Sequence, residues 1–370
     1  LIHPLSIRRT WDMILSYNRT STRGQVTLKV STIGATLLSY QIDGTEFIDG
    51  YLSEDELQTQ DGFRSAVLVP WSDRLCDGRY SSAIYKDDGV GDRPRIGQSP
   101  GPFTADHIFS AKNPKYEPGI HGLVYDKDFK VVENSSESLR LELHLESEPG
   151  YPFELLISVS FDITPDGDLV TRISAQNQSL LACPIFIGWH PYFLLDGPLG
   201  QADLRIYGSS VVETNDDLIP LPGNAAFKPI QSPAPGKVST YADAGYTHLK
   251  NIQDIEHCNP PTGAIAFLDD RALSDFSGYA HLNTGNRSIH IYVDFGADLP
   301  LRTFHVFTGH NLKRNPLTSI AIEPCQAIVN AFNRHDVGNK LVQPGDSRQM
   351  GTLIQAQIQG SYTTTDPTRS

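Results

Sequence analysis

Strict alternation of apolar and polar residues is the clearest pattern in this chain, and it predicts half-buried β-strands. The segment SLRLELHLESE places leucines 139, 141, 143 and 145 on one face and Arg140, Glu142, His144 and Glu146 on the other. The next segment, FELLISVSFDITPDGDLV, repeats the alternation before the Pro/Asp/Gly-rich run TPDGD. Such a run between two alternating segments favours a turn. We therefore expect an antiparallel hairpin or meander here.

The same pattern recurs at both ends of the chain. QVTLKVSTIGATLLSYQIDGTEFI reads as strand, glycine-containing bend, strand, turn at Asp43-Gly44 and strand, and RSIHIYVDFG alternates again near the C-terminus. Almost no long stretch has the helical period. The sequence thus predicts an all-β protein, a large antiparallel β-sandwich with few short helices.

The prolines and glycines are scattered between the strands and mark no single linker. We therefore expect one domain over residues 25–356, with an N-terminal extension at 1–24 and a flexible tail at 357–370. Two segments look irregular, 85–107 and 219–240, and are candidate rim loops over a binding surface.

Composition narrows the class of partner. Of 370 residues, 39% are hydrophobic and 20% charged, as in an ordinary globular protein, and the formal net charge is -13. Because nucleic acids and anionic membranes need a basic face, this charge argues against both, and a neutral small molecule fits better. No apolar run approaches the length that spans a bilayer.

The compartment and the oligomeric state stay open. The N-terminus lacks the apolar core of a signal peptide, which favours the cytoplasm, but it also lacks an initiator Met, so a secreted form with a removed leader is compatible. The cysteines (Cys76, Cys183, Cys258 and Cys325) are widely spread and include no C-x-x-C pair, so they predict no zinc or redox site and leave disulfides open.

IGWHPYFLLDG, residues 187 to 197, places a titratable ring inside an apolar run. His190 follows Trp189 and precedes Pro191, which restricts the backbone of His190 to extended conformations. A half-buried histidine bonded to backbone is one interpretation. A functional imidazole beside aromatic rings that stack on a sugar is the other.

Three further motifs decide between these interpretations: PWSDRLCDGRY (70–80), GIHG (119–122) and IEPCQAIVNAFN (322–333). With GWHPYF, in this order and at these intervals, they resemble the aldose 1-epimerase family, the galactose mutarotases. The resemblance covers roughly residues 25 to 356. It implies a large twisted β-sandwich with a sugar cleft, and interconversion of the α and β anomers of a free sugar without metal or cofactor.

The resemblance also implies the roles of individual residues. His190 matches the family's acid, which protonates the ring oxygen, and Glu323 matches the base, which takes the anomeric proton. Arg74 and His121 match substrate-binding residues. The family's substrate-binding Asp is best matched in AFLDDRALSDF by Asp269, which follows Phe267-Leu268 directly, with Asp270 as the alternative.

Elementary chemistry supports an acid and a base of this kind. Proton transfer is most effective when a group's pKa lies near the operating pH, and an imidazole has an unperturbed pKa of about 6.5. Glu323 follows the apolar run SIAI and precedes Pro324, so we expect it at a strand end where desolvation raises its pKa. Taken singly, Glu323 is also compatible with a rim carboxylate in a salt bridge, and Arg74 with a surface partner of Asp73 or Asp77.

Other functions on the same fold remain open. A non-catalytic carbohydrate-binding protein needs no matched acid and base, and a glycoside-cleaving enzyme would pair Glu323 with Asp269. A hexose-phosphate mutarotase needs cations at the rim, for which the candidates are Arg74, Arg79, Arg93 and Arg95. The acidic chain favours a neutral sugar, and the sequence does not identify which aldose.

Overall fold

The structure is a computed structural model, and it describes residues 14–80, 107–108, 119–135, 138–148, 150–206, 208, 210–229, 254–258, 278–296, 299–338 and 340–358. Within these ranges nearly all regular structure is β, and the single α-helix is the short α1 (Glu54–Thr59). The predicted all-β class with few helices is confirmed.

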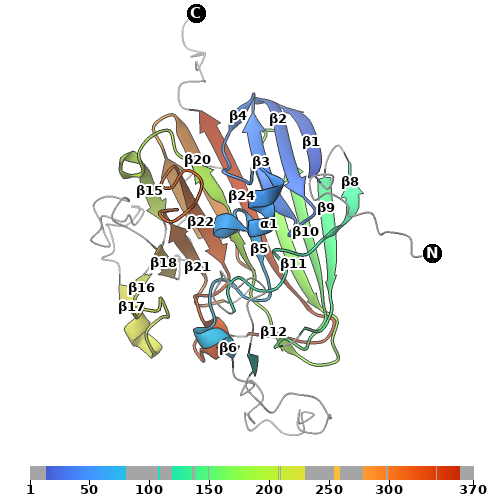
Figure 1. Ribbon diagram of the computed structural model, residues 1–370, viewed down its shortest axis with the longest axis vertical. Helices are drawn as coiled ribbons and strands as arrows, with labels where there is room; N and C mark the ends of the chain where they lie inside the picture. The colour runs from blue at the N-terminus through green and yellow to red at the C-terminus, as the bar shows by residue number, and fades with distance from the viewer. Residues whose placement is uncertain are drawn as a thin grey trace, which may run out of the picture.

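Three sheets make up most of the molecule. The first has β1 (Ile14–Ser21), β2 (Gly24–Ser31), β3 (Thr36–Ile42) and β4 (Thr45–Glu46). The second has, in spatial order, β15 (Asp203–Ile206), β19 (Gly278–Asn283), β20 (Arg287–Asp294), β24 (Ser347–Ile358), β11 (Leu169–Asn177), β10 (Leu155–Ile163), β9 (Ser138–Leu145) and β8 (Lys130–Asn134). Figure 1 shows β20, β24, β11, β10 and β9 running side by side.

The third sheet carries the motifs singled out in the sequence. Its order is β17 (Phe227–Pro229), β16 (Ser210–Val212), β18 (Asp254–Cys258), β21 (Thr303–Phe307), β22 (Ser319–Cys325), β13 (Gly188–His190) and β5 (Ala66–Leu68), with β14 (Tyr192–Leu194) also paired to β22. The short pairs are β12 (Cys183–Pro184) with β23 (Leu341–Val342), and β6 (Arg79–Tyr80) with β7 (His107–Ile108). Short 3-10 turns are η2 (Asp61–Phe63), η3 (Cys76–Gly78), η6 (Leu199–Gln201), η7 (Gly223–Ala226) and η10 (Ala331–Asn333).

The alternation of apolar and polar residues in the sequence corresponds to alternation of buried and less buried residues along the strands of the structure. β10 pairs with β9 and β11 in antiparallel register, and the TPDGD run forms the turn between β10 and β11. Along β10 every second residue, from Leu155 to Ile163, is buried. The bend and turn predicted between residues 25 and 48 separate β2, β3 and β4.

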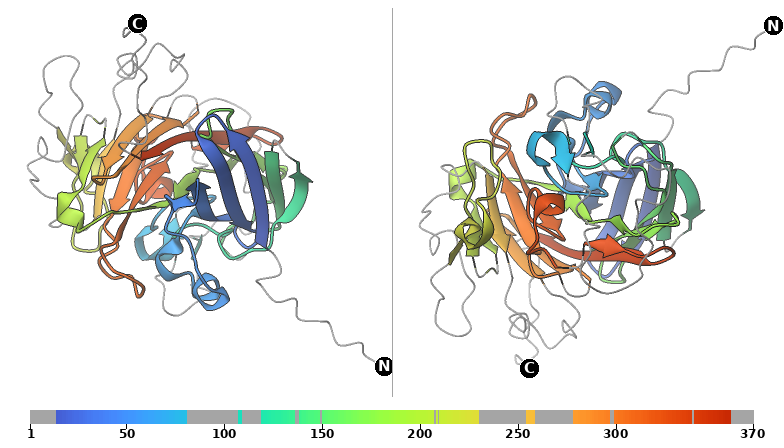
Figure 2. Two further views of the ribbon diagram at one scale, coloured as in Figure 1. Left: turned by 90° about the horizontal axis from the view of Figure 1, so that it is seen from above. Right: turned by 90° about the horizontal axis from the view of Figure 1, so that it is seen from below.

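One hydrophobic core joins the three sheets. It takes Val26 and Leu28 from the first sheet, Ile157 from the second, and Val306 and Ile322 from the third. The sheets therefore pack face to face as a sandwich. In Figure 2 the blue strands of the first sheet and the orange strands of β19 to β21 lie toward opposite ends of the molecule.

The ends of the chain and the two irregular segments are only partly described. β1 lies inside the expected N-terminal extension and pairs along its length with β2, with Tyr17 buried in the core. Residues 81–106 and 230–240 lie outside the described ranges, and they hold nearly all of the candidate rim loop 85–107 and half of the candidate rim loop 219–240. Residues 359–370 also lie outside these ranges. The domain limits stay a prediction. No helix in the described part of the chain is long and apolar enough to cross a membrane.

Candidate active site

The third sheet has one face in the core and one face that carries polar groups. On β13, Trp189 packs into the core, so the pleat turns His190 to the opposite face. On β22, Ile322 is in the core and Glu323 points away from it for the same reason. The alternation of side chains along β13 and β22 thus places an imidazole and a carboxylate on the same face of the sheet.

The strand register brings the two groups into contact. Gly188 on β13 lies opposite Cys325 on β22, and in an antiparallel pair this places His190, two residues further on, opposite Glu323. The distance from Nε2 of His190 to Oε1 of Glu323 is 3.1 Å, and the two side chains are 5% and 1% exposed. The sequence-predicted acid and base form a buried hydrogen-bonded pair.

His121, the histidine of the IHG motif, joins this pair from a loop. Its backbone is left-handed, with φ of 60°, and its N–H donates to the carbonyl of Asp73 at 2.8 Å. At Gly122 a Cβ atom would lie 2.1 Å from the carbonyl oxygen of Val69, so only glycine allows this close approach to the chain next to β5. The imidazole of His121 stands edge-on to that of His190, with 5.1 Å between ring centres.

Arg74 reaches the cluster through Asp73. Arg74 Nη1 donates to one carboxylate oxygen of Asp73 at 2.9 Å, and the other oxygen lies 3.3 Å from Nδ1 of His305. His305 stands on β21 directly opposite Glu323 in the register. Of the two partners that the sequence offered for Arg74, Asp73 is therefore in contact with it.

Burial controls the charge of these groups. It lowers the pKa of His190 well below 6.5, and the neighbouring His121 and His305 lower it further. Burial likewise lowers the pKa of His121 to about 3. For Asp73 burial alone would raise the pKa, but Arg74, His305 and His121 together lower it. The expectation that His190 titrates near neutrality is wrong, because the protein core around it disfavours the imidazolium ion.

Two ring nitrogens in the cluster have hydrogen-bonding capacity to offer. The Nδ1 atoms of His121 and His190 are buried and have no hydrogen-bond partner among the described residues. In the same part of the chain no group of three or more His, Cys, Asp or Glu side chains is arranged to hold a metal ion. Through these Nδ1 atoms, His121 and His190 can offer hydrogen bonding and proton transfer.

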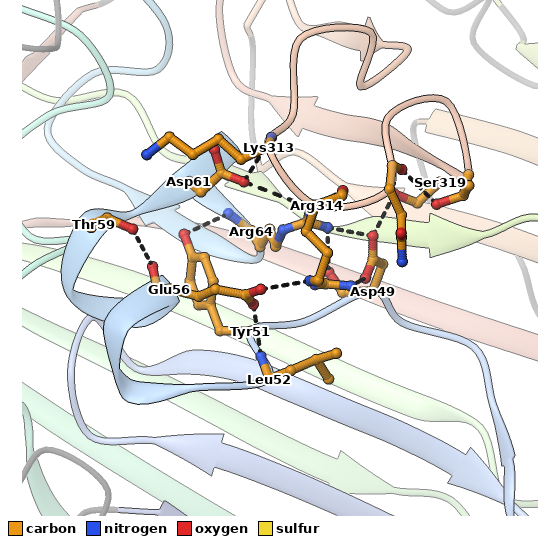
Figure 3. Close-up of polar contacts among 12 residues, drawn as sticks. Asp49, Tyr51, Leu52, Glu56, Thr59, Asp61, Arg64, Lys313, Arg314 and Ser319 are labelled. Atoms are coloured by element: carbon orange, nitrogen blue, oxygen red, sulfur yellow. Dashed lines mark hydrogen bonds and ion pairs between the residues drawn. The ribbon is translucent and has the colours of Figure 1, made fainter.

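A second buried polar cluster lies behind His190. Tyr192 stacks on His190, with ring centres 5.2 Å apart and planes 14° apart, and the guanidinium of Arg64 lies 5.3 Å from the centre of the Tyr192 ring. Arg64 pairs with Asp49, which also accepts from Arg314. We call Asp49, Arg64, Arg314, Glu56 and Ser319 the Asp49 cluster; Figure 3 shows its contacts.

Four of the five site residues named from the sequence lie together. They are His190, Glu323, His121 and Arg74, and with Asp73 and His305 we call them the imidazole cluster. The fifth, Asp269, and its alternative Asp270 lie outside the described residues, as do Arg93 and Arg95. Arg79 is exposed on β6.

Sequence reasoning did not assign a role to Asp73 or His305. The signal for His305 was present in the strand TFHVF, where it alternates with Phe304 and Val306, both of which lie in the core. It is the same signal that drew attention to His190. No local pattern marks Asp73, whose contact with His305 depends on the fold.

Comparison with known proteins agrees with this fold. In Escherichia coli (strain K12), the uncharacterized protein YihR is 27% identical over 306 residues, which is 82% of each chain. The solved structure of a GalM/aldose epimerase homologue from C. elegans covers 93% of this chain and 99% of its own, with 14% identity and a TM-score of 0.67. Galactose 1-epimerase from Lactobacillus acidophilus NCFM covers 93% and 98%, with 14% identity and a TM-score of 0.65.

At these identities the two structures show a shared fold, which is the galactose mutarotase-like β-sandwich. Sequence comparison reaches further, because the family model for aldose 1-epimerase matches residues 99–355 of this chain. The match includes His121, His190 and Glu323. This chain belongs to the aldose 1-epimerase family.

Proposed function

We propose that the protein is a mutarotase, which interconverts the α and β anomers of a free, uncharged aldose with Glu323 as base and His190 as acid. The observation that carries the proposal is the buried contact of 3.1 Å between the two side chains. An acid and a base in one desolvated place can act on the two oxygens attached to a single anomeric carbon.

The reaction balances with these two groups alone. Glu323 takes the proton of the anomeric hydroxyl, the oxygen of that hydroxyl becomes a carbonyl, and the bond from the anomeric carbon to the ring oxygen breaks. His190 gives a proton to the ring oxygen. Rotation about C1–C2 turns the other face of the aldehyde to the hydroxyl, and the two transfers run backward to close the ring. No proton is gained or lost over the cycle.

The lowered pKa of His190 determines when this acid is available. In the free protein the ring is neutral at neutral pH, because burial disfavours its charged form. The protonated fraction rises as the pH falls, while Glu323 must stay ionised to act as base. We therefore expect kcat/KM to be bell-shaped with its optimum on the acid side of pH 6.5, the ordinary pKa of an imidazole.

Charge pairing in the structure supports an uncharged sugar. Arg74 is paired with Asp73, and Arg64 is paired with Asp49, so these two arginines already have carboxylate partners. A phosphate group would need cations that can turn to it as bidentate partners. We expect glucose to be turned over at least as well as glucose 6-phosphate.

Proton NMR saturation transfer between the anomers of glucose and of galactose tests the proposal. With protein present, exchange should be faster than the spontaneous rate, and Glu323→Gln at the same concentration should return it close to that rate. No acceleration on either sugar, nor on any other free aldose, would contradict the proposed function. Sugar binding without exchange would favour a non-catalytic carbohydrate-binding protein.

A further inference from the structure

The Asp73 carboxylate is buried in the cluster but has no part in the acid–base chemistry proposed above. Its side chain is 7% exposed, and each of its oxygens faces a different partner, Arg74 on one side and His305 on the other. Its carbonyl oxygen accepts the backbone N–H of His121. Asp73 thus contacts three other residues of the imidazole cluster, namely Arg74, His305 and His121.

We propose that Asp73 is a positioning residue of this site, which acts through His305 by fixing the tautomer and orientation of its ring. The proposal rests on the proposed function, because it assigns His305 to the same sugar site. Neither residue was expected from the sequence to have a role in catalysis.

The contact itself defines the tautomer. An ionised carboxylate only accepts hydrogen bonds, so the 3.3 Å contact places a hydrogen on Nδ1 of His305. In a neutral ring the hydrogen on Nδ1 leaves Nε2 as the acceptor, because one ring nitrogen donates and the other accepts. The lowered pKa of Asp73 keeps its carboxylate ionised at neutral pH, so this arrangement is held.

The strand register determines where the fixed ring lies. His305 and Glu323 are directly opposite on β21 and β22, so their side chains leave the same face of the sheet with Cβ atoms about 4.5–5.5 Å apart. His305 also acts electrostatically on His190 and on His121. A ring in this place lies beside the proposed base, within the proposed sugar site, and its tautomer determines what it can donate or accept there.

Asp73 is well held for this task. Its backbone is left-handed, with φ of 51°, and the adjoining chain is bridged to the IHG segment, where Arg74 pairs with Ile120. Non-glycine residues rarely adopt this conformation, and they keep it only where the surrounding structure holds the backbone in place. The loop therefore delivers the carboxylate to His305 in one orientation.

A double-mutant cycle tests whether Asp73 acts through His305. Asp73→Asn and His305→Gln should each lower kcat/KM for anomer exchange, by about 10- to 100-fold, the range for a hydrogen bond to a charged group. In the His305→Gln background the further change Asp73→Asn should cost less than about twofold, the usual error of additivity. Equal losses in both backgrounds, or an Asp73→Asn protein with wild-type kcat/KM, would overturn the proposal.

Asp168→Asn is the matched control. Asp168 is also a buried aspartate that pairs with an arginine, Arg23, but it lies away from the imidazole cluster. Its loss should lower the melting temperature and leave the kcat/KM of the folded protein unchanged. If it lowers kcat/KM as much as Asp73→Asn does, the effect of Asp73 is general to buried carboxylates and the proposal fails.

A measurement on the wild-type protein covers the case in which Asp73→Asn does not fold. Long-range ¹H–¹⁵N NMR of histidine-labelled protein reports the tautomer of each ring, and the signal lost in His305→Gln assigns His305. A hydrogen on Nδ1 supports the proposal, and a neutral ring with its hydrogen on Nε2 overturns it. The NMR measurement needs no turnover, so it tests the Asp73–His305 contact even in a protein without activity. Absence of anomer exchange in the wild-type protein would contradict the proposed function, not the tautomer of His305.

Discussion

The imidazole cluster and the Asp49 cluster are two buried polar groups on either side of Tyr192, and they differ in what their members can do. The imidazole cluster lies on the polar face of the third sheet, and the Asp49 cluster meets that sheet at Ser319 of β22. Tyr192 lies between the two clusters, with Arg64 on one side and His190 on the other. In the imidazole cluster three of the polar side chains are histidines. In the Asp49 cluster the cations are two arginines, Arg64 and Arg314.

The arginines make the Asp49 cluster a permanent set of charges. Guanidinium groups keep their protons at any pH that the fold survives, and Asp49 accepts from Arg64, from Arg314 at 2.8 Å and from the hydroxyl of Ser319 at 2.6 Å. Arg314 also pairs with Glu56 on α1. Chain segments far apart in sequence are thus tied together beside β22 and β5 (Figure 3).

The imidazole cluster, in contrast, holds side chains that are uncharged at neutral pH. Burial lowers the pKa of His190 and of His121, so both rings are neutral at neutral pH. A neutral imidazole can accept a hydrogen bond or a proton at one ring nitrogen and donate a hydrogen bond from the other. The comparison teaches that burial of polar groups has two results here: fixed charges hold the loops, and neutral imidazoles lie where the proposed function requires proton transfer.

Removing the acid or the base should have the largest effect on turnover. His190→Ala and Glu323→Gln should each lower kcat by roughly 10²-fold to 10⁴-fold, the usual worth of one general acid or base. Urea unfolding should show a change in stability too small to account for this. A Glu323→Gln protein that is folded and turns over near the wild-type rate would mean that the base is misassigned, and Asp269 would be the next residue to test.

Asp49→Asn should have the opposite effect, with a large loss of stability and little change in turnover. It removes the nearer of two carboxylates from the fully buried Arg64 and leaves Asp61 at 4.0 Å, and breaking a buried ion pair costs about 3–5 kcal/mol of the free energy of unfolding. Turnover per folded molecule should stay within a few-fold of wild type. Urea unfolding measures the loss of stability, and anomer exchange at a fixed concentration of folded protein measures turnover. If kcat falls as far as in Glu323→Gln, the two clusters do not divide the work as described.

Acid should destabilise the protein through its neutral imidazoles. The folded pKa is about 3 for His121 and about 4 for His290, an imidazole of the second sheet, against 6.5 when unfolded. Between these values the unfolded state binds more protons, so the free energy of unfolding should fall as the pH drops from 6.5 toward 4. Urea unfolding at pH 7 and pH 5 measures the fall. His290→Gln should reduce it, and equal stability at both pH values would contradict these pKa shifts.

Arg74→Ala should have the smallest effect, mainly on substrate binding. We expect KM to rise by about tenfold and kcat to change little, because a hydroxyl clamp contributes equally to the ground state and the transition state. Arg74→Lys is the control, since it keeps the charge but loses the fork of donors. A fall in kcat with unchanged KM would place Arg74 in the chemical step.

Most of the fold could be predicted from the sequence because the signal is local. Alternation between Leu139 and Leu145 and again between Leu155 and Ile163 defines two strands and their buried faces without reference to the rest of the chain. Spatial order is not local. That β24, the last strand described, lies between β20 and β11 follows from packing, and no pattern within β24 shows it.

The site was predicted where motifs mark it and missed where only tertiary contacts do. His190 and Glu323 were named from HPYF and IEP, and they are in contact. Asp73 and His305 are far apart in sequence and meet only once β21 and the loop after β5 are in place. The pKa of His190 could not be foreseen for the same reason, because its burial depends on neighbouring strands. The substrate-binding role of Asp269 stays a prediction.

The most direct test of the acid–base pair is the rate of anomer exchange in wild type, His190→Ala, Glu323→Gln and the double variant, each at the same folded concentration. If the two side chains act together on one sugar, the double variant should lose about as much as the worse single variant, since residues that act as a unit are strongly non-additive. A loss equal to the product of the two single losses would show that they act independently and would contradict the account.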